Sequence, residues 1–348
     1  MKISKLIGIT VATMILPLLG SCRNEICYDH YPTMGISFNW EREWERDYGN
    51  HHENGWDAGY YGNEYHELRP AVPEWVNMLR YFPDGHTGEK YLQPGGAQFT
   101  VEEGSECSML LYNGDTEYIV LSDVASVSDA RATATSRSRA SLGVVMERHP
   151  DARTTNPPDV LYATYIDHVP SVKNHELRQI PAKMQPLVYS YIITYEFEHG
   201  IEHVALARGA LGGMAESVYL RTGVTSEETS IILFDCEKRQ SCCRAVVHSF
   251  GAPAFPDAYY GRKAQDDKDK AYTLNLEIML YNGKTLEFNY DISDQLKNQP
   301  RGGVIKVSGL RVEDEQNQSQ GGFNVNVDDW GDSGEIIDLP LGNQPGAQ

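Results

Sequence analysis

The cysteine at position 22 is the residue whose surroundings most clearly indicate a covalent chemistry. It follows Leu19-Gly20-Ser21 and closes a leader that carries two early lysines and then an apolar run, residues 6–16, which is too short to span a bilayer. A basic start, a short apolar stretch and small residues before the cleavage point are the features of a secretory signal peptide. These features, in this order and followed by a cysteine, predict a bacterial lipoprotein signal peptide over residues 1–21. They also predict that Cys22 carries a lipid, which includes palmitate. The alternative is a signal segment that is not cleaved or that receives no lipid.

A second group of residues could bind a ligand through aromatic rings. Residues 40–65 interleave tryptophan and tyrosine with histidine and acidic side chains, and they keep neither a strand period nor a helix period. Exposed rings can stack on sugar faces, whereas a loop that folds back would use them to cover a sheet edge, which is the interpretation we favour. Histidine with carboxylates could also hold a metal, but we predict none. The candidate ligand or partner contacts are Trp40, Trp44, Trp56, Tyr60 and Tyr61.

The remaining cysteines indicate structural thiols. Five are left once Cys22 is lipidated, and in an oxidising envelope Cys236 could pair with Cys242 or Cys243, while at least one thiol must stay free. No histidine lies beside them at the spacing of a zinc ligand. We therefore expect no metal there.

No catalytic motif occurs in the chain. It contains no G-x-S-x-G, no P-loop, no zincin helix and no dinucleotide-binding glycine set. Carboxylate pairs occur by chance among 49 acidic residues, so they predict no glycosidase. We predict a protein that is not an enzyme and that uses no cofactor.

Composition and charge indicate the fold class and the kinds of partner that are disfavoured. With 49 acidic and 30 basic residues the net charge is −19, which disfavours nucleic acid as a partner. The 21 Tyr, 31 Gly and 17 Pro, without a sustained amphipathic helical pattern, predict an all-β protein of many short strands joined by turns. The length after residue 21 predicts two domains.

In the first half, alternating apolar residues predict several strands. An Asn113-Gly114 pair between two of them predicts a hairpin over residues 105–121, since a type I′ turn needs positive φ at both central positions. Residues 126–141 are poor in bulky apolar groups and predict a mobile loop, and residues 159–169 are ambiguous between helix and strand. The other predicted strands are residues 36–40, 74–82 and 97–101.

Prolines at 170, 181 and 186 indicate a domain boundary, which divides the mature chain into residues 22–178 and 179–348. In the second half, residues 272–280 and 286–292 alternate in phase around Asn282-Gly283 and predict a hairpin with a two-residue turn. The strands predicted around it are residues 189–197, 204–206, 231–236, 244–249, 304–312 and 323–327.

The last predicted strands, residues 323–327 and 336–341, could complete this protein's own sheet or that of a neighbour. We favour the first.

Several of these stretches together resemble a known family. The cleavage box, VNMLRYFPDG, SMLLYNGDTEYI, ARGALGGMAESVYL and GGFNVNVDDWGD are similar to the fimbrillin-like lipoproteins of Bacteroidales, in particular to fimbrial anchor and accessory subunits. The resemblance implies two successive β-sandwich domains of transthyretin-like type. It also implies a lipid-anchored outer-membrane protein of the fimbrium, active in cell adhesion, whose partners are pilin subunits joined by β-strand exchange. The alternative function is a surface glycan-binding lipoprotein that uses the loop at residues 40–65.

Overall fold

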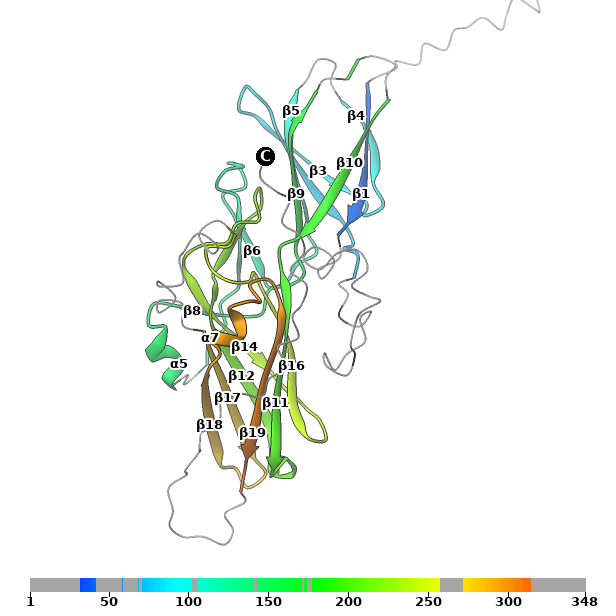
Figure 1. Cartoon of the computed structure of the whole chain (residues 1–348). Coiled ribbons are helices and arrows are strands. Elements are labelled where there is room, and N and C mark those ends of the chain that lie inside the picture. The colour runs from blue at the N-terminus through cyan, green and yellow to red at the C-terminus, as the bar shows by residue number, and fades with distance from the viewer. Residues whose placement is uncertain are drawn as a thin grey trace, which may run out of the picture.

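The structure is a computed structural model, and it describes residues 32–41, 71–101, 106–139, 143–170, 172–173, 177–256 and 272–313, with the single residues 58 and 68. The described part is mostly β, with several sheets and two short α-helices, as the sequence predicted. The molecule is elongated, and β1 starts at one end of it while the β17–β18 turn lies at the other (Figure 1). No helix within the described ranges is both long and apolar enough to cross a membrane.

A seven-stranded sheet forms the end of the molecule at which β1 starts. Its order is β3-β2-β5-β9-β10-β1-β4, and β10 bends so that it meets β9 only at Gln185 and Pro186. β1 pairs in parallel with β10 over its full length. The strands are β1 (Thr33–Trp40), β2 (Val76–Tyr81), β3 (Thr87–Leu92), β4 (Ala97–Thr100), β5 (Cys107–Asn113), β9 (Tyr162–Val169) and β10 (Leu177–Pro186).

The bend lets β4-β1-β10 lie over the other strands, and apolar side chains fill the space between. We call this cluster the N-terminal core. Its largest buried members include Met34, Met78, Met109, Leu111 and Met184. The other face of the sheet packs against a three-stranded sheet of β6 (Ile119–Ser122), β7 (Arg131–Ala134) and β13 (Ser217–Tyr219).

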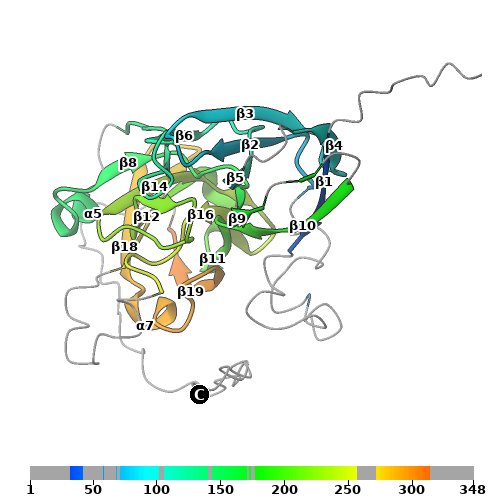
Figure 2. The same ribbon diagram turned by 90° about the horizontal axis from the view of Figure 1, so that it is seen from above.

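Two further sheets face each other at the opposite end of the molecule, and Figure 2 shows the arrangement from above. One has the order β15-β16-β11-β19 and the other β18-β17-β12-β14-β8. Between them lies what we call the C-terminal core, built largely of leucine, isoleucine, valine and tyrosine. The first sheet contains β11 (Tyr189–His199), β15 (Glu237–Lys238), β16 (Cys242–Ser249) and β19 (Gly303–Arg311). The second contains β8 (Arg153–Thr155), β12 (Val204–Ala215), β14 (Thr229–Asp235), β17 (Thr273–Leu280) and β18 (Thr285–Asp291).

Short helical segments connect these strands. The 3-10 turn η2 (Ile201–His203) joins β11 to β12, which lie in different sheets, and α7 (Ser293–Leu296) joins β18 to β19. The helix α5 (Gly143–Arg148) follows β7 and covers the outer face of β14 and β12, where Val145 contacts Ala210, Ile231 and Leu233.

The predicted hairpin over residues 105–121 is wrong. β5 pairs with β2 and β9, while β6 pairs with β7 in another sheet. The Asn113 side chain is buried, accepts the Tyr162 N–H at 2.6 Å and donates to Val160 O, and Gly114 lacks the positive φ of a type I′ turn. Asn113 therefore ties β5 to β9 and is no turn residue.

The predicted mobile loop at residues 126–141 is also wrong, because it contains β7. Ala130, Ala132 and Ala134 are all buried at period 2 against the seven-stranded sheet. Arg137 donates to Asp235 at 2.9 Å, and Arg139 is buried in an ion pair with Glu277. Small side chains allow the two sheets to approach closely, so low bulk here indicates tight packing rather than disorder.

The hairpin at the end of the C-terminal core is confirmed, with a different turn. Met279 pairs with Thr285, and Leu280 N–H donates to Lys284 O, which leaves three loop residues rather than two. Gly283 has a φ of 86°, as expected for the last position of a three-residue loop. In the ambiguous stretch at residues 159–169, Tyr162–Val169 form the strand β9. The predicted strands at 36–40, 74–82, 97–101, 189–197, 231–236, 244–249 and 304–312 are all present with small shifts.

The predicted boundary between residues 178 and 179 falls inside β10. Strands on either side of it also pair with each other, since β8 runs parallel to β14 and β7 pairs with β13. The division into two domains stays a prediction.

Candidate functional site

Trp40 is the one predicted contact residue that lies within the described residues. It ends β1, its indole N–H donates to Pro94 O at 3.2 Å, and its ring meets Tyr162 edge to face with centroids 5.1 Å apart. The ring is half-buried and packs on the N-terminal core. This contact is of the kind expected if the aromatic residues cover a sheet.

The other predicted residues lie outside the described ranges. These are the lipid attachment residue Cys22 and the aromatic residues Trp44, Trp56, Tyr60 and Tyr61. Their roles in lipid attachment and in ligand contact remain predictions.

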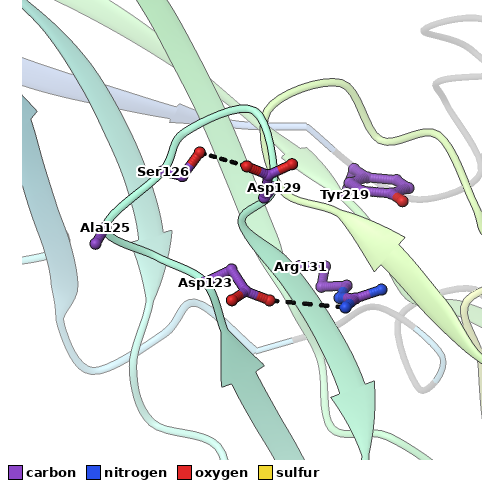
Figure 3. Close-up of a pocket in the computed structure, with 6 residues that line it drawn as sticks. All are labelled: Asp123, Ala125, Ser126, Asp129, Arg131 and Tyr219. Atoms are coloured by element: carbon purple, nitrogen blue, oxygen red, sulfur yellow. Dashed lines mark hydrogen bonds and ion pairs between the residues drawn. The ribbon is translucent and has the colours of Figure 1, made fainter.

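An open cavity of about 380 Å³ lies beside the turn between β6 and β7, and the sequence analysis did not identify it. Figure 3 shows Asp123 facing Arg131 at 3.7 Å and Ser126 donating to Asp129 at 2.5 Å. Its polar groups therefore already have partners within the turn. Within the described ranges, no three histidine, cysteine or acidic side chains lie close enough to hold a metal ion.

The described cysteines are all free thiols, so the suggested pairing of Cys236 with a neighbour is not formed. Burial raises the pKa of Cys236 well above its usual value, and burial with the nearby Cys242 raises the pKa of Cys243 to about 11. Thiols with raised pKa values are poor nucleophiles and poor metal ligands. These residues act as small apolar groups of the C-terminal core.

One buried group of charges ties the β7–α5 connection to the C-terminal sheet. Arg139 donates to Glu277 at 2.6 Å, and Arg208 donates to the other oxygen of the same carboxylate. Burial of Glu277 opposes its ionisation, but the hydrogen bonds and charges of the two arginines outweigh it, so its pKa is lowered. The arrangement fastens a connection and offers no free acid or base for chemistry.

The sheet edges are the features that could engage another chain. A strand at an edge carries unpaired backbone groups that a further strand can satisfy. Most edges here are short or polar: β8 and β15 have three and two residues, and β3 carries exposed charged side chains. Among the described strands, two longer edges remain, β18 and β19.

Two glutamine side chains cap the start of the β19 edge, at Val304 and Lys306. Gln295 accepts from Lys306 N–H and donates to Lys306 O, both at 2.9 Å. Gln299 makes the same pair with Val304, at 2.6 and 3.0 Å. Each amide thus imitates the peptide group of a neighbouring strand. In the sequence, the spacing of four residues between the glutamines is the one sign of this role.

Comparison with known proteins gives independent evidence of what this chain resembles. Residues 65–235 match the family described as a domain of unknown function, DUF5119. Over 246 residues the chain is 23% identical to a Bacteroides ovatus protein named as a candidate fimbrium anchoring subunit, Fim4B, an alignment that covers 70% of this chain and 64% of that protein. The chain therefore spans less than two thirds of this relative.

One solved structure shows a related fold, and others match more distantly. A crystal structure of a candidate adhesin from Bacteroides ovatus superposes with a TM-score of 0.56 at 18% identity, over 85% of this chain and 98% of that one. The fimbrial anchor protein Mfa2 from Porphyromonas gingivalis matches over 79% of this chain and 90% of its own, with 9% identity and a TM-score of 0.42. The sequence similarity to the Bacteroides ovatus protein confirms the predicted resemblance to fimbrial anchor proteins.

Proposed function

We propose, on the premise that this chain is a relative of the Bacteroidales fimbrial anchor and adhesin proteins and carries a DUF5119 domain, that it anchors or accompanies a fimbrium at the outer membrane. The observation that carries the proposal is the similarity to the fimbrium anchoring subunit over 70% of the chain. The cleavage box before Cys22 supports it, since an anchor needs an attachment to the membrane.

In this proposal the mature chain forms two successive β-sandwich domains of transthyretin-like type, residues 22–178 and 179–348. The two clusters that we call the N-terminal and C-terminal cores support it. The first lies between the two halves of one bent sheet and the second between two facing sheets. A pilin subunit binds by β-strand exchange, for which an open sheet edge supplies the hydrogen-bonding groups.

Purification of the native lipoprotein from outer membranes tests the function. We expect pilin subunits to be recovered with it in a fixed ratio. Recovery of a polysaccharide without pilin would replace this proposal with the glycan-binding alternative, and Trp44→Ala with Trp56→Ala would then abolish that binding at an unchanged melting temperature.

The membrane attachment has a separate test. Cys22→Ser removes the thiol that lipid attachment requires, so the folded domains should move from the membrane pellet to the soluble fraction. Circular dichroism of the released protein serves as the control for folding. A variant that stays in the pellet after salt and carbonate washes would contradict the anchor.

A further inference from the structure

The two long sheet edges lie on the same side of the C-terminal core. β15 and β16 contact β12 and β14 in the facing sheet, so the opposite halves, β11 with β19 and β17 with β18, also face each other. The helix α7 closes the end of this side by joining β18 to β19. One side of the core therefore has two edges, and the glutamines cap only the start of one of them, β19.

The β18 edge is open among the described residues. Leu280 N–H donates to Lys284 O at 2.8 Å and Ile292 N–H donates to Tyr272 O at 3.0 Å. Antiparallel alternation then directs the backbone of even-numbered residues of β18 to β17 and that of Thr285, Glu287 and Asn289 away from it. No described residue meets these outward groups.

The apolar face of β18 is also incompletely covered. Leu286, Phe288 and Tyr290 pack against the C-terminal core but are only half-buried, whereas their partners across the strand pair, Ile278, Leu276 and Leu274, are 0% exposed. A further strand with apolar residues at every second position would cover this row and satisfy the outward backbone together.

The chain leaves the described residues close to the start of β18. Val312 N–H donates to His199 O at 3.0 Å, and a Cβ on Gly200 would touch Val312. Three residues further, His203 O accepts the N–H of Tyr281 at 3.0 Å, which is in the turn that begins β18. Figure 1 shows the ends of β19 and β11 and the β17–β18 turn together at this end of the molecule.

The remaining sequence, residues 314–348, supplies a segment of the required pattern. Phe323, Val325 and Val327 alternate with Asn324 and Asn326. Residues 314–322 can span up to about 30 Å when extended, which is ample for a turn back to β18. The later apolar stretch, residues 336–341, is the weaker candidate because Pro340 has no N–H, so the stretch could pair with β18 only in a register that turns Pro340 away from it.

We infer that residues 323–327 of this chain add to β18 as the sixth strand of its sheet. The segment starts at the end where β18 starts, so it runs parallel to β18. Phe323, Val325 and Val327 face the core and cover the row of Leu286, Phe288 and Tyr290, while Asn324 and Asn326 face solvent. This inference goes beyond the proposed function and stands without it.

Hydrogen–deuterium exchange of the full mature chain tests the inference. Peptides that cover residues 285–291 should be protected, and Val325→Asp should speed their exchange by roughly tenfold or more, since it places a charge against an apolar row. Asn324→Asp makes the same charge change on the opposite face of the segment and should leave the exchange rate unchanged. Peptides from β12 and β14 control for global unfolding.

Three outcomes would overturn the inference. The first is exchange of the wild-type β18 peptides as fast as that of the turn at residues 281–283. The second is protection that survives Val325→Asp, which would assign the edge to another segment. The third is protection that rises with protein concentration together with a dimer mass by light scattering, which would assign it to a second copy.

Pilin recovery measured on the same variants separates this inference from the proposed function. Wild-type protein that shows β18 protection but recovers no pilin would contradict only the function. Wild-type protein that recovers pilin but shows an unprotected β18 would contradict only the inference.

Discussion

The two cores of this protein are built from different side chains. The N-terminal core buries Met34, Met78, Met109 and Met184, whereas Met214 is the single methionine of the C-terminal core among the described residues. Methionine is unbranched and adapts to irregular spaces, while branched leucine and isoleucine fix one arrangement more strictly. The difference indicates that the N-terminal core tolerates changes of side-chain shape, whereas the C-terminal core is packed more strictly.

The two regions also differ in their buried hydrogen bonds and ion pairs. The C-terminal sheets carry the buried ion pair of Glu277 with Arg139, the hydrogen bond between His149 and Thr273, and the two glutamines on β19. In the N-terminal sheet the corresponding described tie is the buried amide of Asn113. Buried polar networks specify one geometry and are costly to break, so the far end should respond more strongly to substitution.

The largest expected effect is at the buried ion pair. Glu277→Ala leaves the Arg139 guanidinium, whose side chain is 4% exposed, without its counter-charge, and we expect a loss of about 3–5 kcal/mol in the free energy of unfolding. Urea unfolding measures it. Glu198→Ala removes the partner of Arg311 at an exposed pair and should cost at most about 1 kcal/mol. Equal losses would remove the contrast between buried and surface ties.

Reciprocal core exchanges should give the next largest effect. Leu211, Leu274 and Leu276 changed together to Met should each cost about 1 kcal/mol, since methionine loses more side-chain entropy on burial than leucine. The opposite triple change, Met78, Met109 and Met184 to Leu, should cost clearly less in total. The melting temperatures of the two triple variants measure this difference. A larger fall in melting temperature for the N-terminal variant would mean that the N-terminal core is the more strictly packed of the two.

The pH dependence should give the smallest effect. Burial, with a contribution from the charge of Arg148, lowers the pKa of His149 below the usual 6.5. The unfolded state therefore binds more protons around and below pH 6.5, and stability falls as the pH is lowered through this range. His149→Gln should make the free energy of unfolding less dependent on pH between 7 and 5. Unchanged slopes would show that His149 is not the group responsible, and His248, whose pKa burial also lowers, would be the next candidate.

Many of the strands were predictable because apolar residues at every second position in the sequence face a core in the structure. Tyr272, Leu274, Leu276, Ile278 and Leu280 all face the C-terminal core, as their spacing predicted. The stretch at residues 126–141 could also have been recognised, since Ala130, Ala132 and Ala134 alternate, but alanine carries too little hydrophobic surface to stand out.

Other features depend on contacts between distant residues. Nothing near Asn113 in sequence shows that its side chain will meet Tyr162, which lies 49 positions away. The glutamines of the β19 edge act only once α7 has placed them beside a strand that follows in the chain. The predicted contact residues around Trp44 and Trp56, and the lipid site at Cys22, lie in parts of the chain that the structure does not describe.

The parallel pairing of β1 with β10 has a mechanical consequence for a tethered protein. A tether at Cys22 would pull on the start of β1, which lies at the end of the molecule opposite the β17–β18 turn (Figure 1). β1 is held along all eight of its residues, from Thr33 opposite Leu177 to Trp40 opposite Met184. Tension directed along this strand loads its hydrogen bonds side by side, in shear, instead of opening them one after another. If Cys22 carries the proposed lipid, β1 is therefore the strand that first bears the load, and its pairing with β10 resists it.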